Sequence, residues 1–207
     1  MNLDRRTAIQ WMLAASAALR APTIAFADDV AKTIAANGYG KDPNLIKNYA
    51  PGELWPLTLT SDQRKIASAL SDTIIPPEGN QPGAAGVGVV DFIDEWISAP
   101  YPDNVRDRPL ILEGLAWLDE RARAKYKTGF ASSSDQQRAS LCDELVGTTV
   151  PAALQKPAAF FARYRDLTAV GFYTTPIGTQ DLGYRGNVPL DRYDGPPKEA
   201  LAKLGLG

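Results

Sequence analysis

The sequence contains no histidine and only one cysteine, Cys142, among its 207 residues. Without histidine the chain cannot form a Ser-His-Asp triad, a histidine-ligated zinc or haem site, or an imidazole general base. One cysteine supplies neither the thiolates of an iron–sulfur cluster nor the pair needed for a disulfide. Because no histidine can activate Cys142, a role in core packing is favoured over a nucleophile. A redox cofactor would have to belong to another chain.

An excess of basic residues is also missing, since the formal net charge is −2. A chain without that excess is poorly suited to neutralise phosphates, so we expect no nucleic-acid partner. Long apolar runs are absent too. The most apolar stretch, residues 8–19, falls short of the ~20 residues that a membrane-spanning helix requires.

The first 27 residues have the layout of an export signal. Arg5 and Arg6 precede the apolar, alanine-rich stretch, and the sequence Ala25-Phe26-Ala27 follows as a cleavage site of small residues. Paired arginines before a moderately apolar stretch indicate the bacterial twin-arginine route. We therefore expect residues 1–27 to be a signal peptide cleaved after Ala27, with no membrane span afterwards. The alternative is an uncleaved N-terminal helix that tethers the protein to a membrane.

Helical signals dominate residues 28–170, which we expect to be the helical domain. Residues 28–57 read as an extended linker, with Asn-Gly, Asp-Pro and Pro-Gly turns. Two capping boxes follow, Thr60 with Gln63 and Ser134 with Gln137. The apolar spacing predicts helices near residues 61–75, 89–99, 107–126, 134–146 and 157–171. With no strand-like alternation, the fold class is all-α, an irregular bundle of about five helices.

Residues 171–207 differ in composition and are expected to form an irregular, extended arm that ends in a short C-terminal helix. Residues 171–197 contain five glycines and four prolines, interleaved with aromatic side chains. Rigid aromatic residues and arginines are typical of protein interfaces, so the arm is expected to pack on this domain or on another chain. The candidate partner-interface residues are Phe172, Tyr173, Tyr184, Arg185, Arg192 and Tyr193.

Three neighbouring carboxylates, Asp91, Asp94 and Glu95, could supply an acid/base pair. Such a pair needs one desolvated carboxyl group, and the helical periodicity places these residues mainly on a solvated face. We therefore favour a structural role for these carboxylates over acid/base catalysis. Asp72 is expected to play an architectural part by bonding the backbone of the next turn.

Two further patterns are read as structural. The order of Gly83, Gly86 and Gly88 reverses the dinucleotide-binding fingerprint and no strand precedes it, so the segment is expected to be a loop entering a helix. Trp55, Trp96 and Trp117 are expected in the core or an interface rather than on a sugar-stacking platform. No catalytic, cofactor-binding or metal-binding residue is therefore assigned to this chain.

Several motifs together resemble the gluconate 2-dehydrogenase subunit 3 family, the small or gamma subunits of periplasmic FAD-dependent sugar and polyol dehydrogenases. The arm is the most specific part of the resemblance, with a Gly-Phe-Tyr start, a later Gly-Tyr-Arg-Gly and a Tyr-Asp-Gly. The segments that carry it are the leader around Arg5 and Arg6 and residues 71–76, 83–84, 90–94, 171–178, 183–186 and 193–195.

The resemblance implies a subunit that carries no cofactor and supports a separate catalytic subunit. That partner would be a flavoprotein of the glucose–methanol–choline type that holds FAD, and in some complexes a c-type cytochrome subunit joins it. The small subunit would aid the folding, stability and twin-arginine export of the flavoprotein to the periplasm. The resemblance leaves open whether the substrate is a sugar, a polyol or a glycoside. A different class of function, a stand-alone periplasmic carbohydrate-binding helical module, also remains open.

Overall fold

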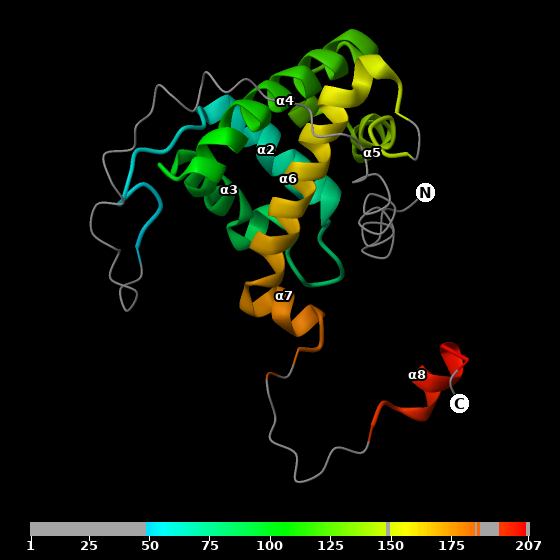
Figure 1. The fold of residues 1–207 in the computed structure, drawn as a ribbon. Helices are drawn as coiled ribbons and strands as arrows, with labels where there is room; N and C mark the ends of the chain where they lie inside the picture. Colours follow the sequence, from blue (N-terminus) through cyan, green and yellow to red (C-terminus); the bar gives the residue numbers. More distant parts are fainter. Residues whose placement is uncertain (1–48, 148–149, 185, 187–194, 206–207) are drawn as a thin grey trace.

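The computed structural model describes residues 49–147, 150–184, 186 and 195–205, and most of these residues are helical (Figure 1). The predicted all-α class is confirmed, because the described residues contain no strand and only one isolated bridge, between Glu78 and Gln81. The signal residues Arg5 and Arg6 and the cleavage position after Ala27 lie outside the described residues.

Seven α-helices and three 3-10 turns make up the described fold. The helices are α2 (Ser61–Ile74), α3 (Val89–Ser98), α4 (Pro102–Tyr126), α5 (Asp135–Asp143), α6 (Gln155–Tyr173), α7 (Pro176–Asp181) and α8 (Lys198–Lys203). The turns are Ala85–Val87, Phe130–Ser132 and Ala152–Leu154. The five longer helices, α2 to α6, form the bundle, and no residue of α8 is buried.

Local sequence signals explain where most helices begin. Both predicted capping boxes are present, with Thr60 and Ser134 as the N-caps of α2 and α5. Helix α4 starts earlier than the predicted residue 107. Pro102 stands in its first turn, where a backbone N–H would have no acceptor within the helix, so proline costs no hydrogen bond there. The helix continues through Pro109. Pro109 has no backbone N–H to donate inside the helix, and the predicted range 107–126 already ran through it.

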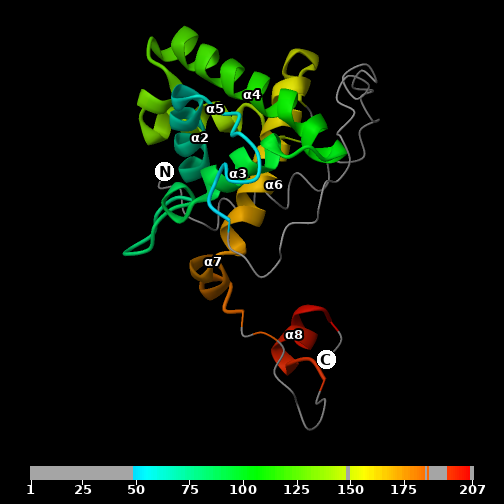
Figure 2. The ribbon, with the colours of Figure 1, turned by 90° about the vertical axis from the view of Figure 1, so that its left-hand side faces the viewer.

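The core lies where α4 and α6 cross with α2 and α3 against them (Figures 1 and 2). The closest approach is at Gly114, where an added Cβ would lie 1.9 Å from Cγ of Phe160. The Tyr164 hydroxyl bridges to α2, donating to the Ala67 carbonyl at 2.9 Å and lying 3.1 Å from the Ser71 hydroxyl. Each buried polar group on this contact therefore has a partner.

Candidate functional site

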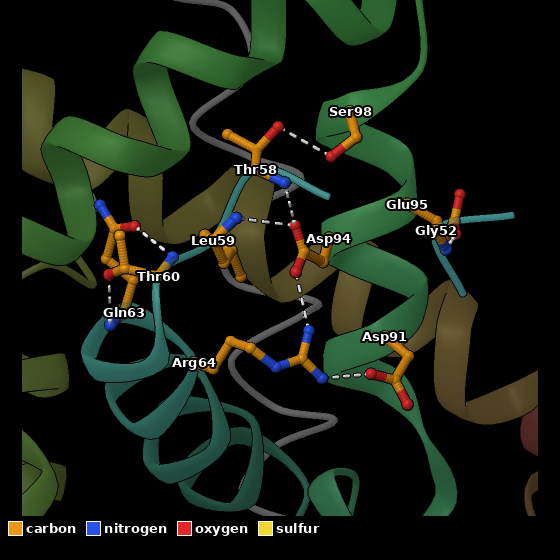
Figure 3. Close-up of polar contacts among 10 residues, drawn as sticks. All are labelled: Gly52, Thr58, Leu59, Thr60, Gln63, Arg64, Asp91, Asp94, Glu95 and Ser98. Carbon is orange, nitrogen blue, oxygen red and sulfur yellow. Dashed lines mark hydrogen bonds and ion pairs between the residues drawn. The ribbon is translucent and has the colours of Figure 1, made fainter. Parts of the chain in front are cut away.

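The carboxylates of α3 were the strongest candidates for acid/base chemistry, and the structure gives them a different role. Asp94 is fully buried, which corrects the prediction of a solvated position for this residue, whereas Asp91 and Glu95 are partly exposed. Its Oδ1 accepts hydrogen bonds from the backbone N–H groups of Thr58 and Leu59, both at 2.9 Å (Figure 3). Its Oδ2 accepts one from Nη1 of Arg64 at 2.7 Å. Both carboxylate oxygens are therefore occupied by the protein itself.

These bonds fasten the segment before α2, which we call the strap (residues 49–59), onto α3. Glu95 accepts a hydrogen bond from the Gly52 N–H, and the Thr58 hydroxyl lies 2.7 Å from that of Ser98 (Figure 3). The indole of Trp55 donates to the Glu95 carbonyl at 3.3 Å. The described part of the expected linker is thus irregular but fixed, because α3 supplies acceptors that an extended segment needs.

Arg64 connects the buried Asp94 to the partly exposed Asp91. Its second guanidinium nitrogen pairs with Asp91, whose side chain is 44% exposed. That hydrogen bond raises the pKa of Arg64, so the guanidinium stays charged opposite the two aspartates. Arg64, Asp91 and Asp94 therefore form a structural ion-pair network.

Asp72 braces the loop between α2 and α3. Its Oδ1 accepts a hydrogen bond from the Ala85 N–H at 2.9 Å, across the loop rather than in the next turn as predicted. Partial burial raises the pKa of its carboxyl group. Gly83 packs against the same oxygen, because an added Cβ there would lie 2.5 Å from it. The role of Asp72 is architectural.

The remaining candidate side chains, Cys142 and Trp96, also have structural roles. Cys142 is fully buried, and burial raises the pKa of its thiol, so it is no nucleophile. Trp96 donates its indole N–H to Asp107 at 2.8 Å, and Arg163 lies over its ring. No group of three or more acidic or cysteine side chains is placed to hold a metal ion among the described residues.

The start of the predicted arm is a rigid corner between α6 and α7, which we call the elbow (residues 171–184). Helix α6 continues to Tyr173, three residues beyond the predicted boundary at 170, and α7 follows where an irregular segment was expected. The Thr174 hydroxyl donates to the Val170 carbonyl at 2.8 Å. The Thr175 hydroxyl accepts from the Gly178 N–H at 3.0 Å and so caps α7. The pattern Gly-Phe-Tyr-Thr-Thr-Pro-Ile-Gly therefore encodes two helix ends and the turn between them.

Glycine is required at the elbow because the two helices touch backbone to backbone. A Cβ at Gly178 would lie 2.1 Å from the Phe172 carbonyl oxygen. A Cβ at Gly171 would lie 2.8 Å from the ring of Phe92 on α3. The elbow is thus locked onto the bundle, and its direction is fixed.

Helix α7 ends in a Schellman motif that sets the position of Tyr184. Gly183 adopts φ +64°, and the Tyr184 N–H donates to the Thr179 carbonyl at 3.0 Å. In this motif the residue in the place of Tyr184 usually packs on apolar side chains one turn earlier. Here those positions hold Thr179 and Gly178, so the tyrosine has no apolar partner on α7 and is 67% exposed.

The structure separates the candidate interface residues into three groups. Phe172 is fully buried in the bundle's own core, so its side chain offers no accessible contact surface. Tyr173 is half-buried, with its ring edge-on to Phe172, whereas Tyr184 is exposed. Arg185, Arg192 and Tyr193 lie outside the described residues.

Two exposed apolar side chains beside these were not among the predicted interface residues. Val170 is 52% exposed and Leu182 is 60% exposed. The helical spacing of α6 gave no reason to single out Val170, since an isolated apolar residue on a helix surface is common. Leu182 precedes Gly183 in the Schellman motif, a signal that the sequence does carry.

The sequence matches the family model described as gluconate 2-dehydrogenase subunit 3 over residues 61–189. This range covers α2 to α7, including the elbow, and begins at the first residue of α2. No curated protein and no solved structure matches the chain. No helix in the described part of the chain has both the length and the apolar character of a membrane span.

Proposed function

Because the chain belongs to the gluconate 2-dehydrogenase subunit 3 family, we propose that it is the non-catalytic small subunit of a dehydrogenase complex whose separate catalytic subunit is a flavoprotein. Family membership makes it a small subunit of a dehydrogenase complex. The proposal adds that the partner is of the glucose–methanol–choline type, carries FAD, and oxidises a hydroxyl group of a sugar, polyol or glycoside.

The absence of catalytic groups supports the non-catalytic part of the proposal. The chain has no histidine, its cysteine is buried, and the acidic residues of α3 are engaged by the strap and Arg64. A fold that commits its titratable groups to its own architecture suits a supporting subunit. The observation that best supports contact with a partner is the elbow, where Leu182 and Tyr184 are exposed at fixed positions.

The leader supports a role in export. A flavoprotein that binds FAD in the cytoplasm has to cross the membrane folded, and the twin-arginine route carries folded cargo. The signal on this chain, with Arg5 and Arg6, would export both subunits to the periplasm once they are bound. Binding to the folded partner would also stabilise it by mass action. In complexes that include a c-type cytochrome, this chain would meet it through the flavoprotein.

Affinity purification tests the proposal directly. A tag placed after Gly207 should recover a yellow partner whose absorption spectrum shows oxidised flavin. Omitting this chain should leave the flavoprotein inactive, insoluble or unexported, whereas a partner that stays active, soluble and exported without it would refute the proposal. Replacing Arg5 and Arg6 by lysine should block export of both subunits and leave the complex itself intact.

A carbohydrate-binding module is the second candidate, and one observation favours it. Trp117 and Phe160 line a groove of about 190 Å³ between α4 and α6, and the ion pair between Glu113 and Lys156 lies at that groove. Calorimetry of the isolated mature chain with gluconate, glucose and sorbitol separates the two functions. The supporting-subunit proposal expects no heat of binding, and a saturable signal lost in Trp117→Ala would favour the module.

A further inference from the structure

The last described helix, α8, lies apart from the bundle. Figures 1 and 2 both show it beyond α7, and no residue of α8 is buried. Leu204, directly after the helix, is 71% exposed, more than any other large apolar side chain among the described residues. The match to the family model ends at residue 189, so α8 also lies outside the matched range. The bundle therefore does not explain why the chain forms this helix.

Local signals in the sequence favour a helix at this position. Glu199 stands in the first turn and Lys203 in the last, where each charge suits the helix dipole. Gly205 adopts φ +67°, and its N–H donates to the Ala202 carbonyl at 3.2 Å. A glycine in this left-handed conformation is a common end of a helix. The sequence thus specifies the helix and its end without contacts to the rest of the fold.

These signals are too weak to hold so short a helix in water. Helix α8 has six residues, and an isolated helix below about 12–15 residues is marginal, because few hydrogen bonds offset the cost of the first turn. Most helical stability in proteins comes from packing of an apolar face. Helical spacing gives α8 such a face, since Ala200, Leu201 and Leu204 lie on one side and the charged residues on the other. A surface that covers the two leucines would therefore stabilise the helix.

Helix α8 follows the elbow closely enough for both to contact one partner. Leu182 and Tyr184, at the end of the elbow, are 60% and 67% exposed. From Tyr184 to Lys198 the chain advances 14 residues, which span at most about 50 Å when fully extended. A partner bound at the elbow would make the contact with α8 intramolecular. Even a weak apolar contact then suffices to hold the helix.

We propose that α8 is a second docking element for the catalytic subunit, and that Leu201 and Leu204 enter an apolar groove on that subunit. This inference rests on the proposed function. Insertion of an amphipathic helix into an apolar groove is a recurring mode of recognition, with apolar anchors three or four residues apart. The two leucines have this spacing. The catalytic subunit keeps α8 helical, and the elbow holds the helix close to its groove.

Hydrogen exchange tests which surface covers α8. In the full-length chain alone the amides of α8 should exchange freely, and in the complex with the flavoprotein they should exchange at least about tenfold more slowly. Unchanged exchange in the complex would overturn the inference. Protection in the isolated chain would overturn it as well, because the leucines would then be covered by the chain's own bundle or by a second copy. A dimer that Leu204→Ala dissociates would identify the second copy.

Substitutions test the two leucines directly. Leu201→Ala and Leu204→Ala should each weaken binding about tenfold. Alanine favours a helix at least as well as leucine, so weaker binding cannot be ascribed to loss of α8. Binding would be measured by biolayer interferometry with the flavoprotein immobilised, which leaves the C-terminus of this chain free.

Matched controls come from the same helix and from the strap. Ala202→Gln changes the opposite face of α8, and Leu54→Ala truncates an exposed leucine of the strap, so both should bind like wild type. Equal effects of the leucine variants and these controls would overturn the inference and leave the proposed function standing. Recovery of no flavoprotein by the wild-type chain would instead refute the proposed function.

Discussion

Removal of the Asp94 carboxylate should detach the strap and destabilise the bundle. Asp94→Ala deletes the acceptor of two backbone N–H groups, at 2.9 Å each, and of the Arg64 guanidinium at 2.7 Å. Hydrogen bonds to a charged group contribute about 1.5–3 kcal/mol each, and breaking a buried ion pair costs about 3–5 kcal/mol. Arg64 is one-third exposed and keeps Asp91, so its share is small. We expect a loss near ~3 kcal/mol.

Two measurements check this expectation. Urea unfolding followed by tryptophan fluorescence gives the change in the free energy of unfolding. Hydrogen exchange should show loss of protection at the amides of Thr58 and Leu59 while the amides of α4 and α6 stay protected. Asp91→Ala is the matched control, since it removes the other, 44% exposed partner of Arg64 and should cost less than ~1 kcal/mol. An equal loss of unfolding free energy in the two variants would refute the role of Asp94 in holding the strap. Unchanged exchange protection of the strap amides in Asp94→Ala would refute it as well.

Three further predictions concern the core and the loop between α2 and α3. Gly114→Ala should destabilise the fold by about 3 kcal/mol in urea unfolding, because the new Cβ would overlap the Phe160 ring; a cost under ~1 kcal/mol would show that the ring can move away. Burial raises the pKa of Asp72, so its contribution to stability is full below the ordinary value of 3.8 and is lost as pH rises through the folded-state pKa. Asp72→Asn, which keeps an oxygen for the Ala85 N–H, should therefore gain stability relative to wild type between about pH 3 and pH 7, and a constant difference would contradict the burial argument. Cys142 should resist a thiol-specific reagent in the native protein and react only in denaturant, since burial raises the pKa of its thiol; rapid native labelling would contradict its place in the core.

Helix positions could be predicted wherever the signal is local. A capping box joins residues three apart, so Thr60 with Gln63 and Ser134 with Gln137 could be recognised without any knowledge of the fold. The start of α4 could not, because its first turns bury the polar residues Asn104 and Asp107, which an apolar pattern does not mark. The predicted start of the irregular arm, residue 171, was also wrong, because contacts between helices decide where α6 ends and α7 follows. Glycines at 171 and 178 read as helix breakers, yet they serve close helix contacts.

By itself, the sequence determined the all-α class and the family, and it excluded chemistry that needs histidine, because each of these depends on composition or on residues close in the chain. Tertiary structure alone decided which polar and aromatic groups are accessible. Asp94 is buried because the strap, about 35 residues earlier, supplies its hydrogen bonds. Phe172 is buried and Tyr184 exposed because α6 enters the core while α7 turns away from it at a glycine contact. Burial is set by contacts between distant segments, and a periodic pattern within one helix does not contain that information.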